Sequence, residues 1–290
     1  MPKNPPFFLS GADPDSEYEA VRKASHHEGA RLFIEDLWER YKPLADDHFL
    51  SDAQKHFHER FWEMYLACTL MENGIDLKST GGTGPDFYFE TPERKVWIEA
   101  VAPGPGTGAD RAPEIIYGVG GTVAHDPIVL RLTAAIRDKK LLMESAISKG
   151  IVSPDDAIII AVNHRNIPKA FMGSTIPFIL KAVFPFGHLS VAFNRDTMEI
   201  VDSRYAYTPK ITKHGGAEVS TEAFLDPAYA IVSGVIDSGV NCVNYPEKMG
   251  KDFLLVHNPT ARQELPCSPF TWCRQNRYEN GEIIEVDPEI

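Results

Sequence analysis

Residues 84–102 read GPDFYFETPERKVWIEAVA, and this segment determines the architecture that we expect. It holds two apolar runs, 85–90 and 95–102, separated by the turn residues TPER at 91–94. Aromatic and β-branched runs around such a turn are typical of a β-hairpin. The hairpin brings two acidic residues, Asp86 and Glu99, close together at one end. A carboxylate in apolar surroundings must be paired, protonated or metal-bound, because burying an isolated charge is costly.

Patterns of helices and further strands extend on both sides of this hairpin. Apolar spacing predicts helices over 16–42 and 52–73, the second with Ser51 as N-cap and Gly74 as its C-terminal stop. A third helix is expected to begin at Pro127 and to end at Gly150. The apolar run 157–162 is typical of a central strand, and more strands are expected at 188–193, 198–201, 229–237 and 252–257.

This order of elements predicts an α/β fold with a mixed central sheet and helices on both faces. Because no repeat or low-complexity linker interrupts the chain, one domain over 1–290 is the simplest organisation. Within it we expect a helical extension (1–50), a core (51–165) and a strand-rich C-terminal part (166–290).

Composition narrows the class of protein. The 290 residues are 43% hydrophobic and 24% charged, which is typical of globular chains and excludes a disordered or collagen-like one. No apolar run approaches the length of a membrane span, and the N-terminus lacks a signal-peptide pattern, so a cytoplasmic location is expected. Four cysteines without a C-x-x-C pair fit a reducing compartment and argue against a zinc site.

Charge is unevenly distributed along the chain. The formal net charge is −12, which argues against non-specific binding to nucleic acid. The segment 157–217, however, carries seven Lys and Arg residues against three acidic ones. This segment predicts either a basic face that follows a phosphate backbone or an ordinary solvated surface.

The acidic residues and the elements around them resemble the PD-(D/E)XK nuclease superfamily, which has a restriction-endonuclease-like fold. The resemblance covers roughly residues 54–163, with Glu63 in an apolar helix, GPD at 84–86 and EAV at 99–101. It implies Mg²⁺ or Mn²⁺ bound by Asp86, Glu99, Glu63 and the backbone carbonyl of Ala100. It further implies a metal-dependent deoxyribonuclease, a hydrolase of phosphodiester bonds with DNA as its partner.

One position departs from the family pattern. Val101 stands where the motif lysine is expected, a residue that helps to activate the attacking water. Some members place this lysine on the following helix, where Arg131 and Lys139 share one face. Lys139 is therefore the first candidate for the catalytic lysine, Lys140 the second, and Arg131 a candidate phosphate contact. Further candidate contacts to the nucleic-acid backbone are Arg204, Lys210 and Lys213.

Two alternative interpretations stay open, and a third is disfavoured by the residues themselves. The chain could be a catalytically inactive relative that binds nucleic acid or a protein partner, as Val101 suggests. It could instead be a small-molecule phosphoesterase that uses the same carboxylates, as the acidic net charge suggests. The run GPGTGA at 104–109 matches a dinucleotide-binding fingerprint, but Pro105 and Pro113 oppose the helix that such a site requires.

Overall fold

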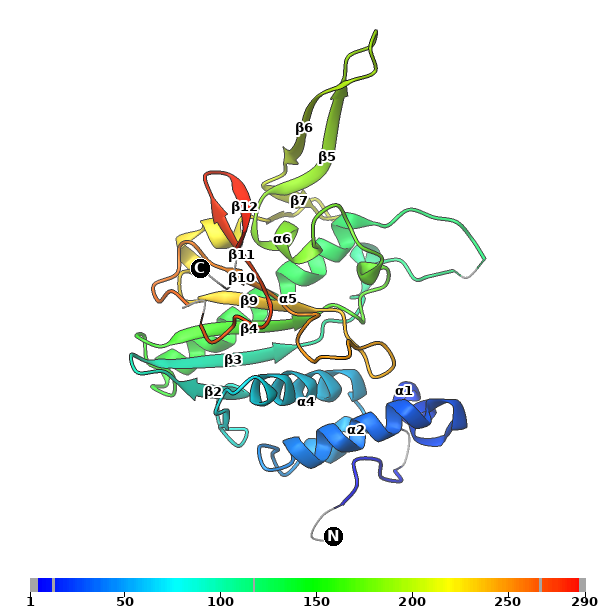
Figure 1. Ribbon diagram of the computed structural model, residues 1–290, viewed down its shortest axis with the longest axis vertical. Coiled ribbons are helices and arrows are strands. Elements are labelled where there is room, and N and C mark those ends of the chain that lie inside the picture. The colour runs from blue at the N-terminus through cyan, green and yellow to red at the C-terminus, as the bar shows by residue number, and fades with distance from the viewer. Residues whose placement is uncertain (1–4, 12–13, 117, 266–267, 287–290) are drawn as a thin grey trace.

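A single large sheet organises the protein (Figure 1). The computed structural model describes residues 5–11, 14–116, 118–265 and 268–286. Within these residues eight strands are joined side by side, and two small hairpins lie outside the sheet. In spatial order the sheet contains β1 (Lys78–Ser79), β2 (Phe87–Glu90), β3 (Lys95–Val101), β4 (Ala157–Asn163), β9 (Gly234–Ser238), β10 (Leu254–His257), β11 (Arg274–Glu279) and β12 (Glu282–Val286). The hairpins are β5 (Phe186–Phe193) with β6 (Ile200–Tyr207), and β7 (Lys210–Thr212) with β8 (Glu218–Ser220).

Strand direction makes the sheet mixed. Strands β3, β4 and β9 are parallel neighbours, whereas β2 and β10 run antiparallel to the strands beside them, β3 and β9. The C-terminal ends of β3, β4 and β9 therefore meet at one edge, which we call the carboxyl edge. In α/β sheets this edge is the usual place for a ligand site.

Helices cover both faces of the sheet (Figure 1). One face carries α1 (Ser16–Lys23), α2 (Glu28–Tyr41), α3 (Phe49–Ala53) and α4 (Phe57–Glu72), and the other carries α5 (His125–Ser148) and α6 (Phe178–Val183). Each layer has its own buried cluster of apolar side chains. The predicted α/β class, with a mixed sheet, N-terminal helices and a strand-rich C-terminal part, is confirmed.

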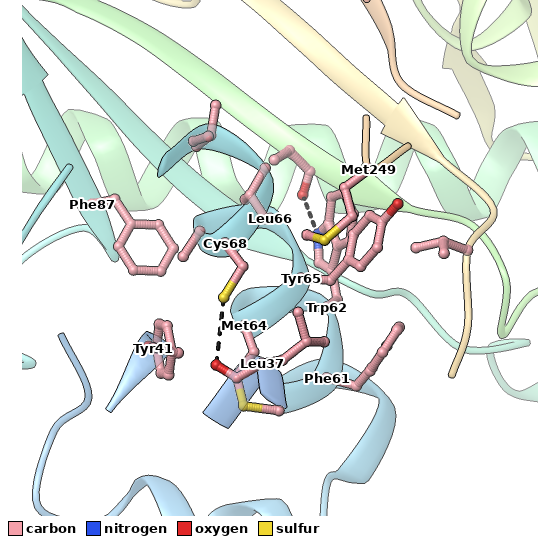
Figure 2. Packing of buried hydrophobic residues seen from close by; sticks show 14 of the residues in the cluster. Leu37, Tyr41, Phe61, Trp62, Met64, Tyr65, Leu66, Cys68, Phe87 and Met249 are labelled. Carbon is pink, nitrogen blue, oxygen red and sulfur yellow. Dashed lines mark hydrogen bonds between the residues drawn. The ribbon is translucent and has the colours of Figure 1, made fainter. Parts of the chain in front are cut away.

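Helix α4 lies at the centre of the first layer (Figure 2). It is apolar on almost every side, and the side chains of residues from Phe57 to Leu70 are nearly all buried. The indole of Trp62 donates a hydrogen bond to the carbonyl of Ala161 in β4 (3.1 Å), and the thiol of Cys68 donates one to the carbonyl of Leu37 in α2 (3.4 Å). These two bonds lock α4 between the sheet and α2.

Two predicted helices are in fact interrupted. The helix expected over 16–42 breaks because Ala24 is extended, and the Arg31 guanidinium caps the end of α1 at the carbonyl of Val21 (3.0 Å). The helix expected over 52–73 begins only at Phe57, since residues 54–56 leave the helix and Asp15 donates to the carbonyl of Gln54 (2.6 Å). Both breaks depend on contacts that no local pattern reveals.

Some of the predicted helix ends are confirmed, whereas a predicted N-cap and a predicted strand start are wrong. Ser51 is not an N-cap, because it lies inside α3 and its hydroxyl donates to the carbonyl of His48. Gly74 and Gly150 do end their helices, both with positive φ. The strand expected at 229–237 begins at Gly234, because Asp226 caps a 3-10 turn over Pro227–Tyr229.

The structure also bears on the expectations about membrane spans and cysteines. Among the described residues, no helix is both long and apolar enough to cross a membrane. Cys68, Cys242 and Cys273 are buried free thiols, and Cys267 lies outside the described residues.

A buried histidine on α4 makes stability depend on pH. His58 is 5% exposed, and its Nε2 lies 3.2 Å from Oδ1 of Asn163. Burial lowers the pKa of His58 to about 4, below the value near 6.5 of an unfolded chain. Between these values the unfolded chain binds the extra proton, so the free energy of unfolding should fall as the pH falls from about 6.5 to about 4, by about 3 kcal/mol in total.

His58→Gln tests this link, since glutamine retains an amide donor for Asn163 but does not titrate. Urea unfolding at a series of pH values should give a shallower fall for the variant over this window. Parallel curves for the two proteins would contradict the assignment.

Candidate functional site

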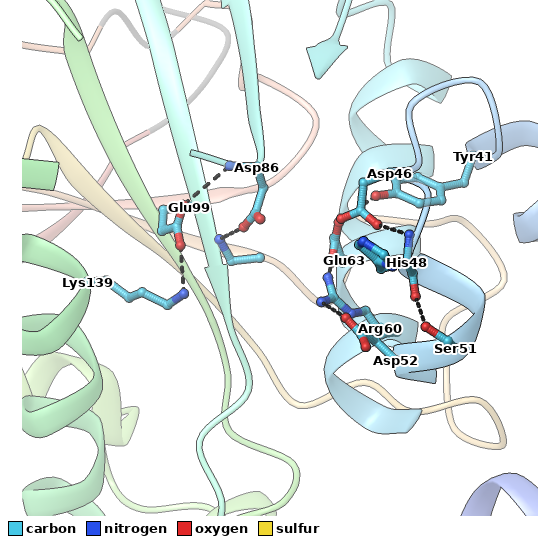
Figure 3. Close-up of polar contacts among 11 residues, drawn as sticks. Tyr41, Asp46, His48, Ser51, Asp52, Arg60, Glu63, Asp86, Glu99 and Lys139 are labelled. Carbon is cyan, nitrogen blue, oxygen red and sulfur yellow. Dashed lines mark hydrogen bonds and ion pairs between the residues drawn. The ribbon is translucent and has the colours of Figure 1, made fainter. Parts of the chain in front are cut away.

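The hairpin β2–β3 brings two carboxylates together at the carboxyl edge (Figure 3). Phe87 pairs with Ile98, so Asp86 lies opposite Glu99. The amide of Asp86 donates to Oε2 of Glu99 (3.3 Å), and the amide of Ala100 donates to Oδ2 of Asp86 (2.7 Å). Glu99 is buried and Asp86 is half-buried. The backbone itself therefore holds both carboxylates in fixed positions.

A lysine from the opposite layer completes this group. Lys139 extends from α5, and its Nζ lies 2.6 Å from Oε1 of Glu99. Burial alone would lower the pKa of Lys139, but the Glu99 carboxylate outweighs burial and raises it, so the ammonium is charged. We refer to Asp86, Glu99 and Lys139 together as the carboxylate–lysine site.

Val101 stands at the position where the resemblance places a lysine. Residues 99 and 101 of β3 point to the same face of the sheet. On that face Val101 packs against the apolar cluster under α5 and α6. The structure thus brings Lys139, the first lysine expected from the sequence, to the carboxylate that the motif lysine would accompany. Its catalytic role stays a prediction.

Negative charge at the site is incompletely balanced. Burial and, next, the charge of Glu99 raise the pKa of Asp86. Burial and, next, the charge of Asp86 raise the pKa of Glu63. Each carboxylate thus makes ionisation of its neighbour harder, and a divalent cation beside Asp86 and Glu99 would relieve this repulsion.

Glu63 lies on the far side of the strands, on α4 (Figure 3). Its Oε1 accepts from the Tyr41 hydroxyl (2.5 Å), and its Oε2 accepts from the Arg60 guanidinium (2.6 Å). Arg60 also pairs with Asp52 (3.1 Å). Both Glu63 oxygens are therefore engaged, and a metal at Glu63 would have to share them with these donors.

The donor set fits a divalent cation in part. Carboxylate and carbonyl oxygens are the ligands that Mg²⁺ and Mn²⁺ prefer. Asp86 and Glu99 supply two carboxylates, and Ala100 is held beside them by its bond to Asp86. Within the described ranges, however, no three His, Cys, Asp or Glu side chains gather as a ready metal cage. The metal roles of Asp86, Glu99, Glu63 and the Ala100 carbonyl stay predictions.

The other predicted cations are distributed over the molecule. Arg131 lies on the Lys139 face of α5, and its Nε donates to the carbonyl of Gly104 just beyond β3 (2.9 Å). Lys140 pairs with Glu144 (2.8 Å) and lies over the ring of Tyr229. The remaining three are on or beside the small hairpins: Arg204 on β6, Lys210 on β7, and Lys213 just after β7.

The loop 104–109 does not form a dinucleotide site. Its residues lead into a 3-10 turn at Gly108–Asp110, and the next helix, α5, begins only at His125. Instead, Arg131 fastens the start of the loop at Gly104 beside the carboxylate–lysine site.

A histidine–aspartate pair at the same edge was not predicted from the sequence. His164 follows β4, and its Nδ1 lies 2.9 Å from Oδ1 of Asp237 on β9. Each residue lies at the end of an apolar run, and this is the one sequence feature that points to a position at a strand end. Nothing in the sequence indicates that the two runs are adjacent parallel strands.

Comparison with known proteins adds no relative: no family model, no curated protein and no solved structure matches this chain.

Loss of the Glu99 charge should remove the response to metal. In wild-type protein, excess Mn²⁺ should raise the melting temperature, because a ligand at about 100 times its Kd stabilises by about 3 kcal/mol. Glu99→Gln should abolish that rise, and it should cost about 2 kcal/mol in EDTA because Lys139 loses its partner. Thermal unfolding with EDTA and with Mn²⁺ measures both effects.

Glu144→Gln is the matched control, since it removes a carboxylate from the neighbouring Lys140 pair on the same helix. This variant should keep the full response to Mn²⁺. An undiminished response in Glu99→Gln would exclude Glu99 as a metal ligand.

Proposed function

We propose that this protein is a metal-dependent nuclease similar to the PD-(D/E)XK superfamily, which hydrolyses phosphodiester bonds in DNA. The observation that carries the proposal is the carboxylate–lysine site: Lys139 lies 2.6 Å from Glu99, which in turn accepts from the amide of Asp86. Two carboxylates at the end of adjoining strands and a lysine from the helix beside them are the groups that this chemistry requires.

Each group has a role in the proposed reaction. Asp86 and Glu99 would hold Mg²⁺ or Mn²⁺, which supplies Lewis-acid polarisation of a phosphoryl oxygen. The Ala100 amide orients Asp86 for this task through its hydrogen bond. The Lys139 ammonium would orient the attacking water and offset negative charge that develops on the phosphate.

Arg131 is the best-placed candidate for a phosphate contact. It lies two helical turns before Lys139 on the same face of α5, and its bond to Gly104 holds it near the end of β3. We therefore propose that the backbone of the substrate approaches along the carboxyl edge, between the loop after β3 and the N-terminal half of α5.

A second candidate function, partner binding without catalysis, draws on the hairpin β5–β6. This hairpin projects from the body (Figure 1) and exposes large apolar side chains, among them Phe193, Met198 and Ile200. Its residues 186–207 include two arginines and three acidic residues, and Arg204 already lies beside Asp202 (3.4 Å). Such a surface suits a protein better than a phosphate backbone, and DNA contacts by Arg204 stay a prediction.

The buried free thiols of Cys68, Cys242 and Cys273 fit a reducing compartment, and we propose a cytoplasmic location on that ground.

Cleavage assays test the nuclease proposal. Wild-type protein with Mg²⁺ or Mn²⁺ should cleave at least one of plasmid, linear duplex and single-stranded DNA, and Asp86→Asn should not. Lys139→Met should reduce the rate by at least about a hundredfold, since it removes a proton-transfer or charge-stabilising group. The same variant should keep the Mn²⁺-dependent rise in melting temperature.

Lys140→Met is the control, because Lys140 is the adjacent lysine and pairs with Glu144. Loss of cleavage in this variant alone would assign the catalytic lysine to position 140. No cleavage of any DNA form by wild-type protein would contradict the proposal and favour the partner-binding function.

A further inference from the structure

The carboxyl edge carries a second group of side chains, two strands away from the carboxylate–lysine site. The loops after β4 and after β9 line an open hollow of about 430 Å³. Its charged and aromatic lining consists of two basic residues, one carboxylate, two aromatic residues and one histidine: Arg165, Lys251, Asp252, Phe171, Tyr245 and His164. None of these groups has a part in the proposed hydrolysis.

The imidazole of His164 is held rigidly. Its Nδ1 is bonded to Asp237 (2.9 Å), and its side chain is only 18% exposed. Burial alone would lower the pKa of His164, but the Asp237 carboxylate outweighs burial and raises it. Because Nδ1 is committed to Asp237, Nε2 is the nitrogen left for a ligand.

A glycine lies directly against the imidazole of His164. A Cβ atom at position 239 would lie 2.7 Å from Nε2, 3.2 Å from Cε1 and 3.4 Å from Cδ2 of His164. These distances are too short for carbon contacts, so any side chain at position 239 would displace the imidazole. Gly239 therefore allows His164 to keep its place beside Asp237.

Two cations beside this space lack carboxylate partners. Across the described part of the chain, no carboxylate lies within ion-pair distance of Arg165 or Lys251, and the Arg165 guanidinium lies 4.4 Å above the ring of Phe171. The nearby carboxylates either have hydrogen-bond partners of their own or lie beyond ion-pair distance of Arg165 and Lys251. Asp237 is bound to His164, Asp252 accepts from Tyr65 and Ser238, and Glu17 influences Arg165 without an ion pair.

Aromatic rings complete the lining. Tyr245 stacks on Phe33 with 3.8 Å between ring centroids and is still 40% exposed, while Phe171 is 44% exposed. Cations interleaved with partly exposed rings are the combination that holds phosphates and stacks bases of single-stranded nucleic acid.

We propose that this hollow binds one nucleotide of a single-stranded substrate, with a phosphate oxygen at Nε2 of His164 and the charge balanced by Arg165 and Lys251. The inference deepens the proposed function and rests on it for the link to catalysis. Strands in a sheet are about 4.8 Å apart, so β9 lies about 10 Å from β3. A few nucleotides of single strand cover that distance, so one strand could occupy both sites.

Binding of a fluorescein-labelled single-stranded oligonucleotide in EDTA tests the proposal, because the readout requires neither metal nor cleavage. Gly239→Ala should weaken binding about tenfold without altering charge, since its methyl group would displace the His164 imidazole that contacts the phosphate. Arg165→Gln should weaken binding to a similar degree and should reduce the salt dependence by about one phosphate contact. Tyr245→Ala, which alters neither charge nor the space at Gly239, should weaken binding by at least about fivefold.

Arg195→Gln on the projecting hairpin is the matched control for charge, and it should bind as tightly as wild type with an unchanged salt dependence. Melting curves in EDTA identify any variant that fails to fold. If wild type does not bind the oligonucleotide, or if every folded variant binds like wild type, the proposal is overturned.

Isothermal titration with a free nucleoside monophosphate separates the two sources of this ligand. Weak binding of the monophosphate beside tight binding of the oligonucleotide supports a strand subsite. Tight monophosphate binding that Gly239→Ala removes, without oligonucleotide binding, would overturn the strand assignment in favour of a free nucleotide. If the oligonucleotide binds in a Gly239-dependent way but no DNA is cleaved, the subsite proposal stands and the nuclease proposal fails. If DNA is cleaved but Gly239→Ala does not weaken oligonucleotide binding, the nuclease proposal stands and the subsite proposal fails.

Discussion

The buried charge of Glu99 is the constraint around which the site is built. A carboxylate within a central strand is costly to bury, and the Lys139 ammonium at 2.6 Å offsets that cost. The resulting ion pair joins β3 to α5, which is also the connection between β3 and β4. The same contact therefore fixes the position of α5 on the sheet and the distribution of charge at the end of the β2–β3 hairpin.

Parallel strands concentrate chemistry at one edge of this sheet. Strands β3, β4 and β9 all end there, and each contributes polar residues close to its C-terminus: Glu99, then Asn163 and His164, then Asp237. The interiors of these strands are apolar and hold the two helical layers in place. Rigid strands thus support two groups of polar side chains, about 10 Å apart by strand spacing.

Positive and negative side chains are unevenly distributed over the molecule. Negative charge dominates the chain as a whole, yet Lys139, Arg131, Arg165 and Lys251 all lie at or near the carboxyl edge. The projecting hairpin β5–β6 has the opposite character, with an apolar surface and a slight excess of acidic residues. A cation-rich end of the sheet and an apolar, weakly acidic hairpin therefore occur on one chain.

Local pattern alone determined the hairpin at 85–102, the apolar strand at 157–162, the helix that ends at Gly150 and the pairing of Asp86 with Glu99, because each depends on spacing between near neighbours. Lys139 was singled out by the resemblance to PD-(D/E)XK nucleases together with its place on one face of a helix. Tertiary structure decided the rest: the breaks at Ala24 and at 54–56, the engagement of Glu63 by Tyr41 and Arg60, and the meeting of His164 with Asp237. Those features depend on residues brought together from distant parts of the chain, and the energy of such contacts leaves no periodic trace in sequence.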